Sequence, residues 1–263
     1  MSQFFGLSRH EFTMSIRRPG LWIAYGLLFL FFTSFMFMSS PGGALDENEV
    51  ITMPDLWKYA GRFIIQFNLF LPVVGGILAA DRMQRDFRLG VRELQNSTPL
   101  SRPVYILGKY FGVLASVFLP VFLWVTALAV ALAATGYAPW AMVYAMPVVC
   151  LVMTVPAFAF VTAFSLACPL IMPLRVYQIL FTGYWFWGNA LNSDVFPTLN
   201  GTLLTAGGMF AYQGFFGGFP KSIPVPREYT VLDATLNLLV LGLCILACMI
   251  VIDRYLHWQA QRA

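Results

Sequence analysis

The sequence predicts an all-α integral membrane protein, a single transmembrane domain over residues 1–263 with six transmembrane helices. Composition is the first reason: 59% of the residues are hydrophobic and only 11% are charged, whereas soluble domains have roughly 25% charged residues. Long apolar runs are the second, since several approach the ~20 residues that cross the hydrocarbon core of a bilayer. The net charge of +4 comes from basic residues beside these runs, as expected for cytosolic flanks of spans. We therefore expect membrane lipid, and no nucleic acid, as a partner.

The N-terminal residues 1–20 are predicted to be an interfacial segment on the cytosolic side. On a helix, Phe5, Phe12 and Ile16 share one face, which favours a weakly amphipathic helix along the inner membrane surface, with a disordered tail as the alternative. Residues 21–38 are apolar or hydroxylic without interruption, long enough for the first span. This run is too long for a signal peptide and is followed by no convincing cleavage site, so we expect an uncleaved span.

Turn signals and apolar length predict five further spans. Thr52-Met53-Pro54-Asp55 places proline early in a first turn and an acid near its positive end, so we expect a helix that runs into the second span. The segment "TGYAPW" divides a long stretch without Asp, Glu, Lys or Arg into a helical hairpin, spans three and four. The predicted positions are residues 63–80 for span two, 110–174 for spans three and four together, about 176–192 for span five and 234–252 for span six.

Residues 193–230 are predicted to be an outer loop that carries a re-entrant element between spans five and six. Its part over residues 197–220 is apolar, but six glycines and a proline at both ends make a straight helix unfavourable. With six spans and a cytosolic N-terminus, 12 Lys and Arg residues lie inside and 4 outside, which fits the positive-inside rule. A seventh span leaves this tally unchanged, so the glycines and prolines carry the prediction.

Catalytic and metal chemistry have no candidate residues in this chain. The four cysteines lie in apolar surroundings and the two histidines stand at opposite ends of the sequence, so we expect no metal site. The predicted spans contain no Asp, Glu, Lys, Arg or His in their interiors, which argues against a proton-coupled transporter and an intramembrane enzyme; a sodium site built from backbone carbonyls remains open. The polar span residues, read either as interhelical hydrogen bonds or as candidates for a translocation path, are Gln66, Asn68, Thr126, Thr162, Gln178, Tyr184 and Asn189.

A nucleotide site is also missing from the sequence. Gly108-Lys109 is followed by Tyr110, and no glycine stands five residues earlier, so the phosphate-binding loop of ATPases is absent. Energy for uphill transport would have to come from another chain.

Residues 81–109 form the one strongly charged segment, a predicted cytosolic loop between spans two and three. On a helix, its apolar residues form a narrow stripe and its arginines gather roughly opposite. The stripe consists of Met83, Phe87, Val91 and Leu94, and the charged residues are Arg85, Asp86, Arg88, Arg92 and Glu93. Such a helix either rests on anionic lipid through its arginines or docks a cytosolic partner. Nucleic acid is disfavoured because no stacking aromatic residues accompany the arginines.

The amino-acid sequence of this segment resembles the cytosolic loop of ABC type-2 transporter permeases. In that family a charged helix of the form E-x-G-T-L-E-L-L is followed by T-P-[LV]-S-R and then by Y-x-L-x-K at the start of the next span. The matching residues here are Asp86, Gly90, Val91, Glu93, Leu94, Thr98, Pro99, Leu100, Ser101, Arg102, Tyr105, Leu107 and Lys109. The basic N-terminal segment and the glycine-rich outer element are similar to the family more loosely.

The resemblance implies the permease half of an ATP-driven exporter in a bacterial inner membrane, without catalytic residues of its own. It implies a second permease half and a cytosolic ABC ATPase subunit, which binds ATP and Mg²⁺ and docks on the charged segment through Arg85, Asp86, Arg88, Arg92 and Glu93. The short turn "CPLIMPLR" would offer that ATPase a smaller contact. The alternatives are a channel or membrane scaffold subunit, and an ABC-like accessory subunit for maturation of an exported enzyme.

Overall fold

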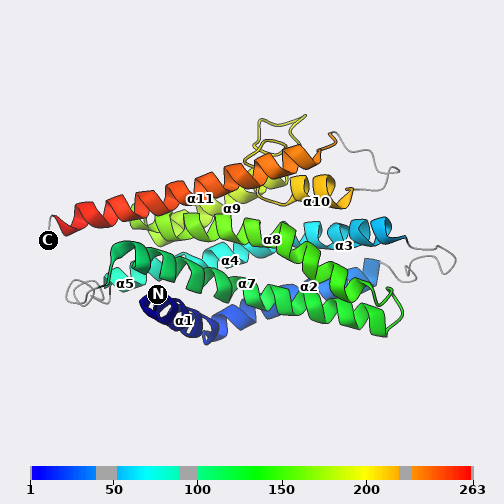
Figure 1. The fold of residues 1–263 in the computed structure, drawn as a ribbon, viewed down its shortest axis with the longest axis horizontal. Coiled ribbons are helices and arrows are strands. Elements are labelled where there is room, and N and C mark those ends of the chain that lie inside the picture. Colours follow the sequence, from blue (N-terminus) through cyan, green and yellow to red (C-terminus); the bar gives the residue numbers. More distant parts are fainter. Residues whose placement is uncertain (1, 40–51, 89–99, 219–226, 262–263) are drawn as a thin grey trace.

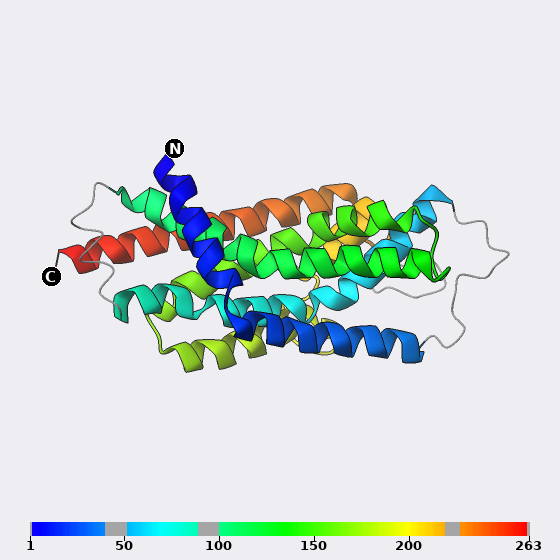
Figure 2. The same cartoon turned by 90° about the horizontal axis from the view of Figure 1, so that it is seen from below.

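The structure is a computed structural model that describes residues 2–39, 52–88, 100–218 and 227–261, and in these ranges the regular structure is helical (Figure 1). The helices run mostly along one long axis, and the chain termini lie toward the same end of the bundle (Figures 1 and 2). The elements are α1 (Ser2–Ile16), α2 (Pro19–Ser39), α3 (Met53–Asn68), α4 (Leu71–Ala79), α5 (Asp81–Arg88), α7 (Arg102–Ala134), α8 (Met142–Ala167), η1 (Cys168–Leu170), α9 (Leu174–Asn189), α10 (Met209–Phe216) and α11 (Val231–Ala260).

Three of the described helices are long and apolar enough to cross a membrane. They are α7, α8 with its η1 extension and α11, and the bent pair formed by α3 and α4–α5 could be a fourth. The described apolar part of α2, Pro19–Ser34, is shorter, and α9 has 16 residues, fewer than the ~20 that span the hydrocarbon core. The all-helical, multi-pass prediction is confirmed, whereas the six-span topology stays a prediction.

The hairpin of α7 and α8 forms the centre of the bundle. Helix α8 contacts α3, α4, α7 and α11, and its side chains Met146, Val149 and Met153 are almost completely buried. The predicted turn between the two helices is confirmed, since Gly136 has a φ of 79° there, a backbone conformation that glycine adopts without steric cost. Apolar packing around α8 therefore orders the elements on both sides of it.

The prediction of one continuous helix through residues 63–80 is wrong, because α3 and α4 are separated by a bend of 44°. The helix begins as predicted, with Thr52 at its N-cap and proline in its first turn. It ends at Asn68 because Pro72, at the start of α4, has no N–H to donate to the carbonyl four residues earlier. In the break, the Leu69 carbonyl accepts a hydrogen bond from the indole Nε1 of Trp185 at 2.8 Å.

Helix α1 lies across α7 at the end of the bundle that carries the termini (Figure 2). The close approach is made over Gly108 and Gly112 of α7: a Cβ added at Gly112 would lie 2.6 Å from the Ser8 carbonyl oxygen. The spacing of these glycines is the small-xxx-small pattern of membrane helix packing. The predicted apolar face of α1 does not make this contact, since Phe5 is exposed and the polar residues Glu11 and Ser15 are buried.

The outer element lies at the opposite end of the bundle, beside the starts of α3 and α11 (Figure 1). Its described part contains one regular helix, α10, of eight residues, which begins after Gly208 and ends before Gly217, both with positive φ. No helix of spanning length therefore occurs in residues 197–218, in agreement with the prediction against a seventh span. Whether this element re-enters the membrane stays a prediction.

We expect Gly112→Ala to lower the free energy of unfolding by about 1–3 kcal/mol, because the added methyl group meets the α1 backbone in a close-packed contact. The matched control is Gly26→Ala on α2, where an added Cβ meets no atom within 4 Å and a small gain in helix stability is expected. Thermal unfolding of the purified protein, followed by tryptophan fluorescence, measures both. Equal effects of the two substitutions would contradict the close contact between α1 and α7.

Candidate functional site

A buried cluster of charged side chains joins α1, α5 and α7 beside the charged segment. The ammonium Nζ of Lys109 lies 2.7 Å from Glu11 Oε1 and 2.7 Å from Asp86 Oδ2. Lys109 is 0% exposed, and the hydroxyl of Tyr105 donates a second hydrogen bond to Asp86 Oδ2 at 2.6 Å. One ammonium thus connects the N-terminal helix and the charged segment to the same turn of α7.

A second ion pair fixes the start of α5 to the start of α2. The Nη1 atom of Arg18 donates to both carboxylate oxygens of Asp81, at 3.0 and 2.9 Å. Arg82, the next residue, is only 3% exposed, and its Nε lies 3.7 Å from Asp81 Oδ1. Desolvation of the buried Arg82 charge is costly unless it is paired, whereas the Arg18–Asp81 side chains are 28% and 32% exposed. The ion pairs together connect α1, α2, α5 and α7.

Of the predicted ATPase-docking residues that the structure describes, some are accessible at the surface and one is directed into the cluster. Arg88 is exposed and Arg85 is half-buried, so both guanidinium groups are accessible to a partner. Asp86 is directed inward to Lys109 and Tyr105. Arg92 and Glu93 lie outside the described residues. In the apolar stripe, Met83 is buried at 1% exposure, and the rest of the stripe is outside the described side chains.

The turn "CPLIMPLR" packs against the charged segment. The side-chain amide of Gln84 on α5 donates to the carbonyl oxygens of Pro169 and, at 3.1 Å, of Met172. The turn that the sequence suggests as a smaller contact for an ATPase therefore lies directly beside the predicted main contact.

Several residues of the cluster were missed as site residues from the sequence. The predicted sites included Asp86 but omitted its partners Glu11 and Lys109, as well as Arg18, Asp81 and Arg82. Two signals could have found them: Lys109 stands within the small-xxx-small pair Gly108 and Gly112, and Glu11 is a lone acid in a basic segment.

Near the other end of the bundle, asparagine side chains hold the outer element. The amide Nδ2 of Asn68, at the break between α3 and α4, donates to the carbonyl oxygens of Met153 and Gly207 at 3.2 and 3.3 Å. The Gly207 N–H donates to Asn189 Oδ1 at 2.7 Å, and Asn237 of α11 donates to the Leu203 and Thr205 carbonyls. The structure therefore brings two predicted path residues, Asn68 and Asn189, to one glycine.

The other predicted path residues do not gather at this point. Gln178 donates to the Ile77 carbonyl at 3.4 Å, and Thr126 donates to Phe122 of its own helix. Thr162 is buried without a hydrogen-bond partner for its hydroxyl, Tyr184 is half-buried and Gln66 is exposed. The role of these residues in a translocation path stays a prediction.

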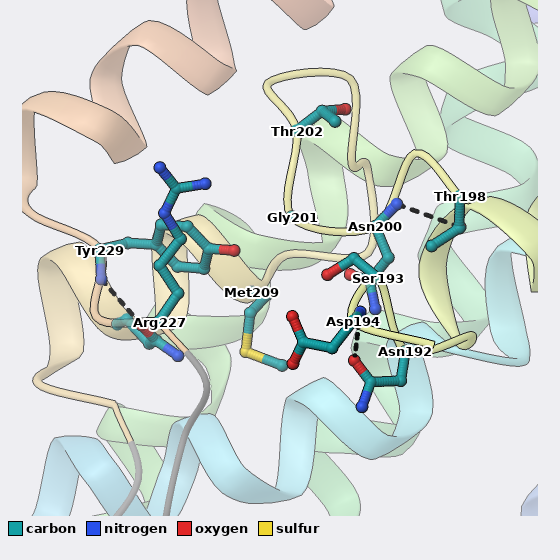
Figure 3. A pocket seen from close by; sticks show the side chains of 11 residues that line it. Asn192, Ser193, Asp194, Thr198, Asn200, Gly201, Thr202, Met209, Arg227 and Tyr229 are labelled. Atoms are coloured by element: carbon teal, nitrogen blue, oxygen red, sulfur yellow. Dashed lines mark hydrogen bonds between the residues drawn. The ribbon is translucent and has the colours of Figure 1, made fainter. Parts of the chain in front are cut away.

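A polar pocket of about 320 Å³ opens in the outer element (Figure 3). Asp194 and Arg227 line it together with hydroxyl and amide side chains. Several of these side chains form hydrogen bonds with nearby backbone groups of the same element; Asn192 Oδ1, for example, accepts from the Asp194 N–H at 2.9 Å. Partial burial raises the pKa of the Tyr229 phenol, and Arg227 opposes this effect.

Comparison with protein families adds an independent observation. Residues 6–181 match the family model described as ABC-2 family transporter protein, which is more than half of the 263-residue chain. The chain belongs to the ABC-2 transporter family. Neither the comparison with curated proteins nor that with solved structures gave a match.

The region that matches the family contains the ion pairs but not the polar pocket. Residues 6–181 include most of α1, the charged segment and α7, and hence the Lys109 cluster. The outer element and α11 follow the matched region. The family is therefore recognised through the part of the permease that contains the ion pairs, and the polar pocket lies in the part beyond it.

We expect Lys109→Met to destabilise the permease by about 3–5 kcal/mol, because it leaves two buried carboxylates without their cation. The control is Lys58→Met, which removes a pair with Asp55 whose side chains are 35% and 42% exposed and should change stability little. Thermal unfolding in a neutral detergent compares the two. A loss at Lys109 no larger than the loss at Lys58 would show that the buried cluster does not hold α1 and α5 to α7.

Proposed function

We propose that the chain is the permease half of an ATP-driven ABC exporter, and that a separate cytosolic ATPase subunit docks on the charged segment. Family membership supports a permease, and the sequence lacks a phosphate-binding loop of its own. The end of the bundle that carries the charged segment also holds most of the basic residues, which favours a cytosolic position.

The Lys109 cluster is the observation that carries the coupling proposal. Helices α4 and α5 run on from Leu71 to Asp86 as the second half of the bent pair, so α4 connects α5, the first part of the charged segment, to the break at Asn68. A displacement of α5 by the ATPase would act on α1 and α7 through Asp86 and Lys109, and on the break through α4. This makes the charged segment a two-state element whose position ATP binding can bias.

The arrangement favours this coupling over the lipid-resting reading of the charged segment. A helix that only rests on lipid needs accessible arginines but no inward carboxylate bound to a buried lysine. Here Arg88 faces outward while Asp86 connects inward, which is the division of roles that transmission of force requires. In a passive channel or scaffold the same pair would serve only to hold the helices together.

A second permease half is expected to cover the outward face of α11. Exposed leucines follow one another there at alternating intervals of four and three residues, the spacing of a helix–helix seam. The exposed fractions range from 40% to 67% for Leu232, Leu236, Leu239, Leu243, Leu246 and Ile250. The opposite side of α11, with Leu241 at 2% exposure, faces its own bundle.

Charge reversal tests the docking proposal. We expect the permease with Arg88→Glu and Arg92→Glu to reach the membrane normally but to lose the P-loop ATPase that co-purifies with the unaltered permease from gently solubilised native membranes. Arg254→Glu, at an exposed position on α11 at the same end of the bundle, is the matched control and should retain the ATPase. Full recovery of the ATPase with the double variant would remove the docking role and restore the lipid reading.

Photo-crosslinking tests the second half. A benzoylphenylalanine residue at Leu243 should give a covalent product with another permease subunit in native membranes, and the same residue at the buried Leu241 should not. The mass of the product distinguishes a second copy from a different chain. If neither position yields a protein product, α11 faces lipid, and the second half must bind elsewhere.

A further inference from the structure

A cavity of about 310 Å³ lies at the junction of α1 and α2, on the same end of the bundle as the ion pairs. The polar residues that line it are Arg18 and Arg82, and its apolar walls include Leu21, Leu78 and Val117. Gly20 also lines it, and a Cβ added there would meet no atom within 4 Å. The cavity thus combines two guanidinium groups with apolar walls beside the first residues of an apolar helix.

Arg82, one of the residues that line this cavity, has hydrogen-bond donors without an acceptor. The side chain is 3% exposed, and its Nε and Nη1 atoms are buried without a hydrogen-bond partner. The nearest carboxylate oxygen, Asp81 Oδ1, is 3.7 Å from Nε and already accepts from Arg18. A buried guanidinium with unsatisfied N–H groups is costly, so an anion with several acceptor oxygens would stabilise it.

The charged groups around Arg82 carry one excess positive charge. Arg18 and Arg85 repel the charge of Arg82, and Asp81 and Glu11 attract it. Together with the Lys109–Asp86 pair, the neighbourhood holds the four cations Arg18, Arg82, Arg85 and Lys109 against the three carboxylates Glu11, Asp81 and Asp86. Glu11 Oε2 also lacks a partner, but Glu11 already neutralises Lys109 at 2.7 Å. A phosphodiester with one negative charge balances the excess.

The surface next to the cavity is suited to hydrocarbon chains. Ile23, Leu27 and Leu30 follow one another along one stripe of α2 and are 62%, 68% and 68% exposed. This stripe starts one turn beyond the cavity and runs away from the basic end of the bundle. The planar fork of arginine matches the oxygens of a phosphate, so the head group and the chains of one lipid would find separate, adjacent contacts.

We propose that this cavity binds the phosphate of an anionic phospholipid, held by Arg82 and Arg18 while its acyl chains lie along α2. The bound phosphate satisfies the buried guanidinium of Arg82 and thereby stabilises the junction at which α1, α2 and α5 meet. Inorganic phosphate offers the same oxygens without the chains, and the test separates the two sources. Binding of the lipid at this cavity does not require the ATPase partner.

The test uses the purified full-length permease in an uncharged detergent. Dioleoyl phosphatidylglycerol, dioleoyl phosphatidylcholine or inorganic phosphate is added in turn, and thermal unfolding is followed by tryptophan fluorescence. We expect phosphatidylglycerol to raise the unfolding midpoint most and inorganic phosphate to leave it unchanged. In Arg82→Met the apparent affinity for phosphatidylglycerol should fall by about tenfold or more, the loss of one charge-assisted hydrogen bond. Arg254→Met, on the surface of α11, should respond as the unaltered permease does.

Two further measurements test lipid binding at this cavity even if Arg82→Met folds poorly. Arg82→Lys keeps the charge and loses the fork, so its response to phosphatidylglycerol should be intermediate. Native mass spectrometry of the unaltered permease should retain one phosphatidylglycerol molecule in preference to phosphatidylcholine. Equal responses to the two lipids, an undiminished response in Arg82→Met, or an equal response to inorganic phosphate would each overturn the lipid assignment.

Discussion

The burial of Lys109 is the constraint on which the arrangement at the basic end of the bundle depends. An ammonium without contact with water requires anionic partners at hydrogen-bond distance, and Lys109 has two, Glu11 and Asp86, each at 2.7 Å. These partners come from segments far apart in the sequence. The position of α1 and the start of the charged segment are therefore both set by one side chain of α7.

The glycines of α7 make this ion pair geometrically possible. Because Gly108 and Gly112 have no side chains, the backbone of α1 approaches α7 closely enough for Glu11 to reach Lys109. Apolar side chains of α1 also contact α7, since Leu7 packs over Gly108 and the rings of Phe4 and Phe111 lie 6.0 Å apart. The backbone of a glycine is also a contact point at the outer element, where the side chains of Asn68 and Asn189 both form hydrogen bonds with Gly207.

The bent pair of α3 and α4–α5 connects the two ends of the permease. At the outer side of the bend Asn68 holds the outer element, and at the far end of α5 Asp86 holds Lys109. This pair lies between two polar clusters, with apolar packing around α8 between them, so a displacement at one end of the bundle can act on the other. In the proposed exporter, the ATPase would act at one end of this pair and the permease would open or close at the other.

The sequence by itself determined the helical membrane class, the hairpin of α7 and α8, the start of α3 and the family, because these depend on local apolar length, prolines, turns and a contiguous motif. Of the site, the sequence found Asp86 and Arg88 but assigned both to one exposed surface.

Only the tertiary structure decided which charges turn inward. Glu11 and Lys109 are 98 residues apart, and helical periodicity reports which residues share a face but not which face another helix will cover. The break after Asn68 was missed for a related reason: a proline in an apolar run is compatible with a continuous kinked helix, and the hydrogen bond in the break between Leu69 and Trp185 joins residues 116 apart. Burial and pairing over such separations arise from packing, which local patterns do not contain.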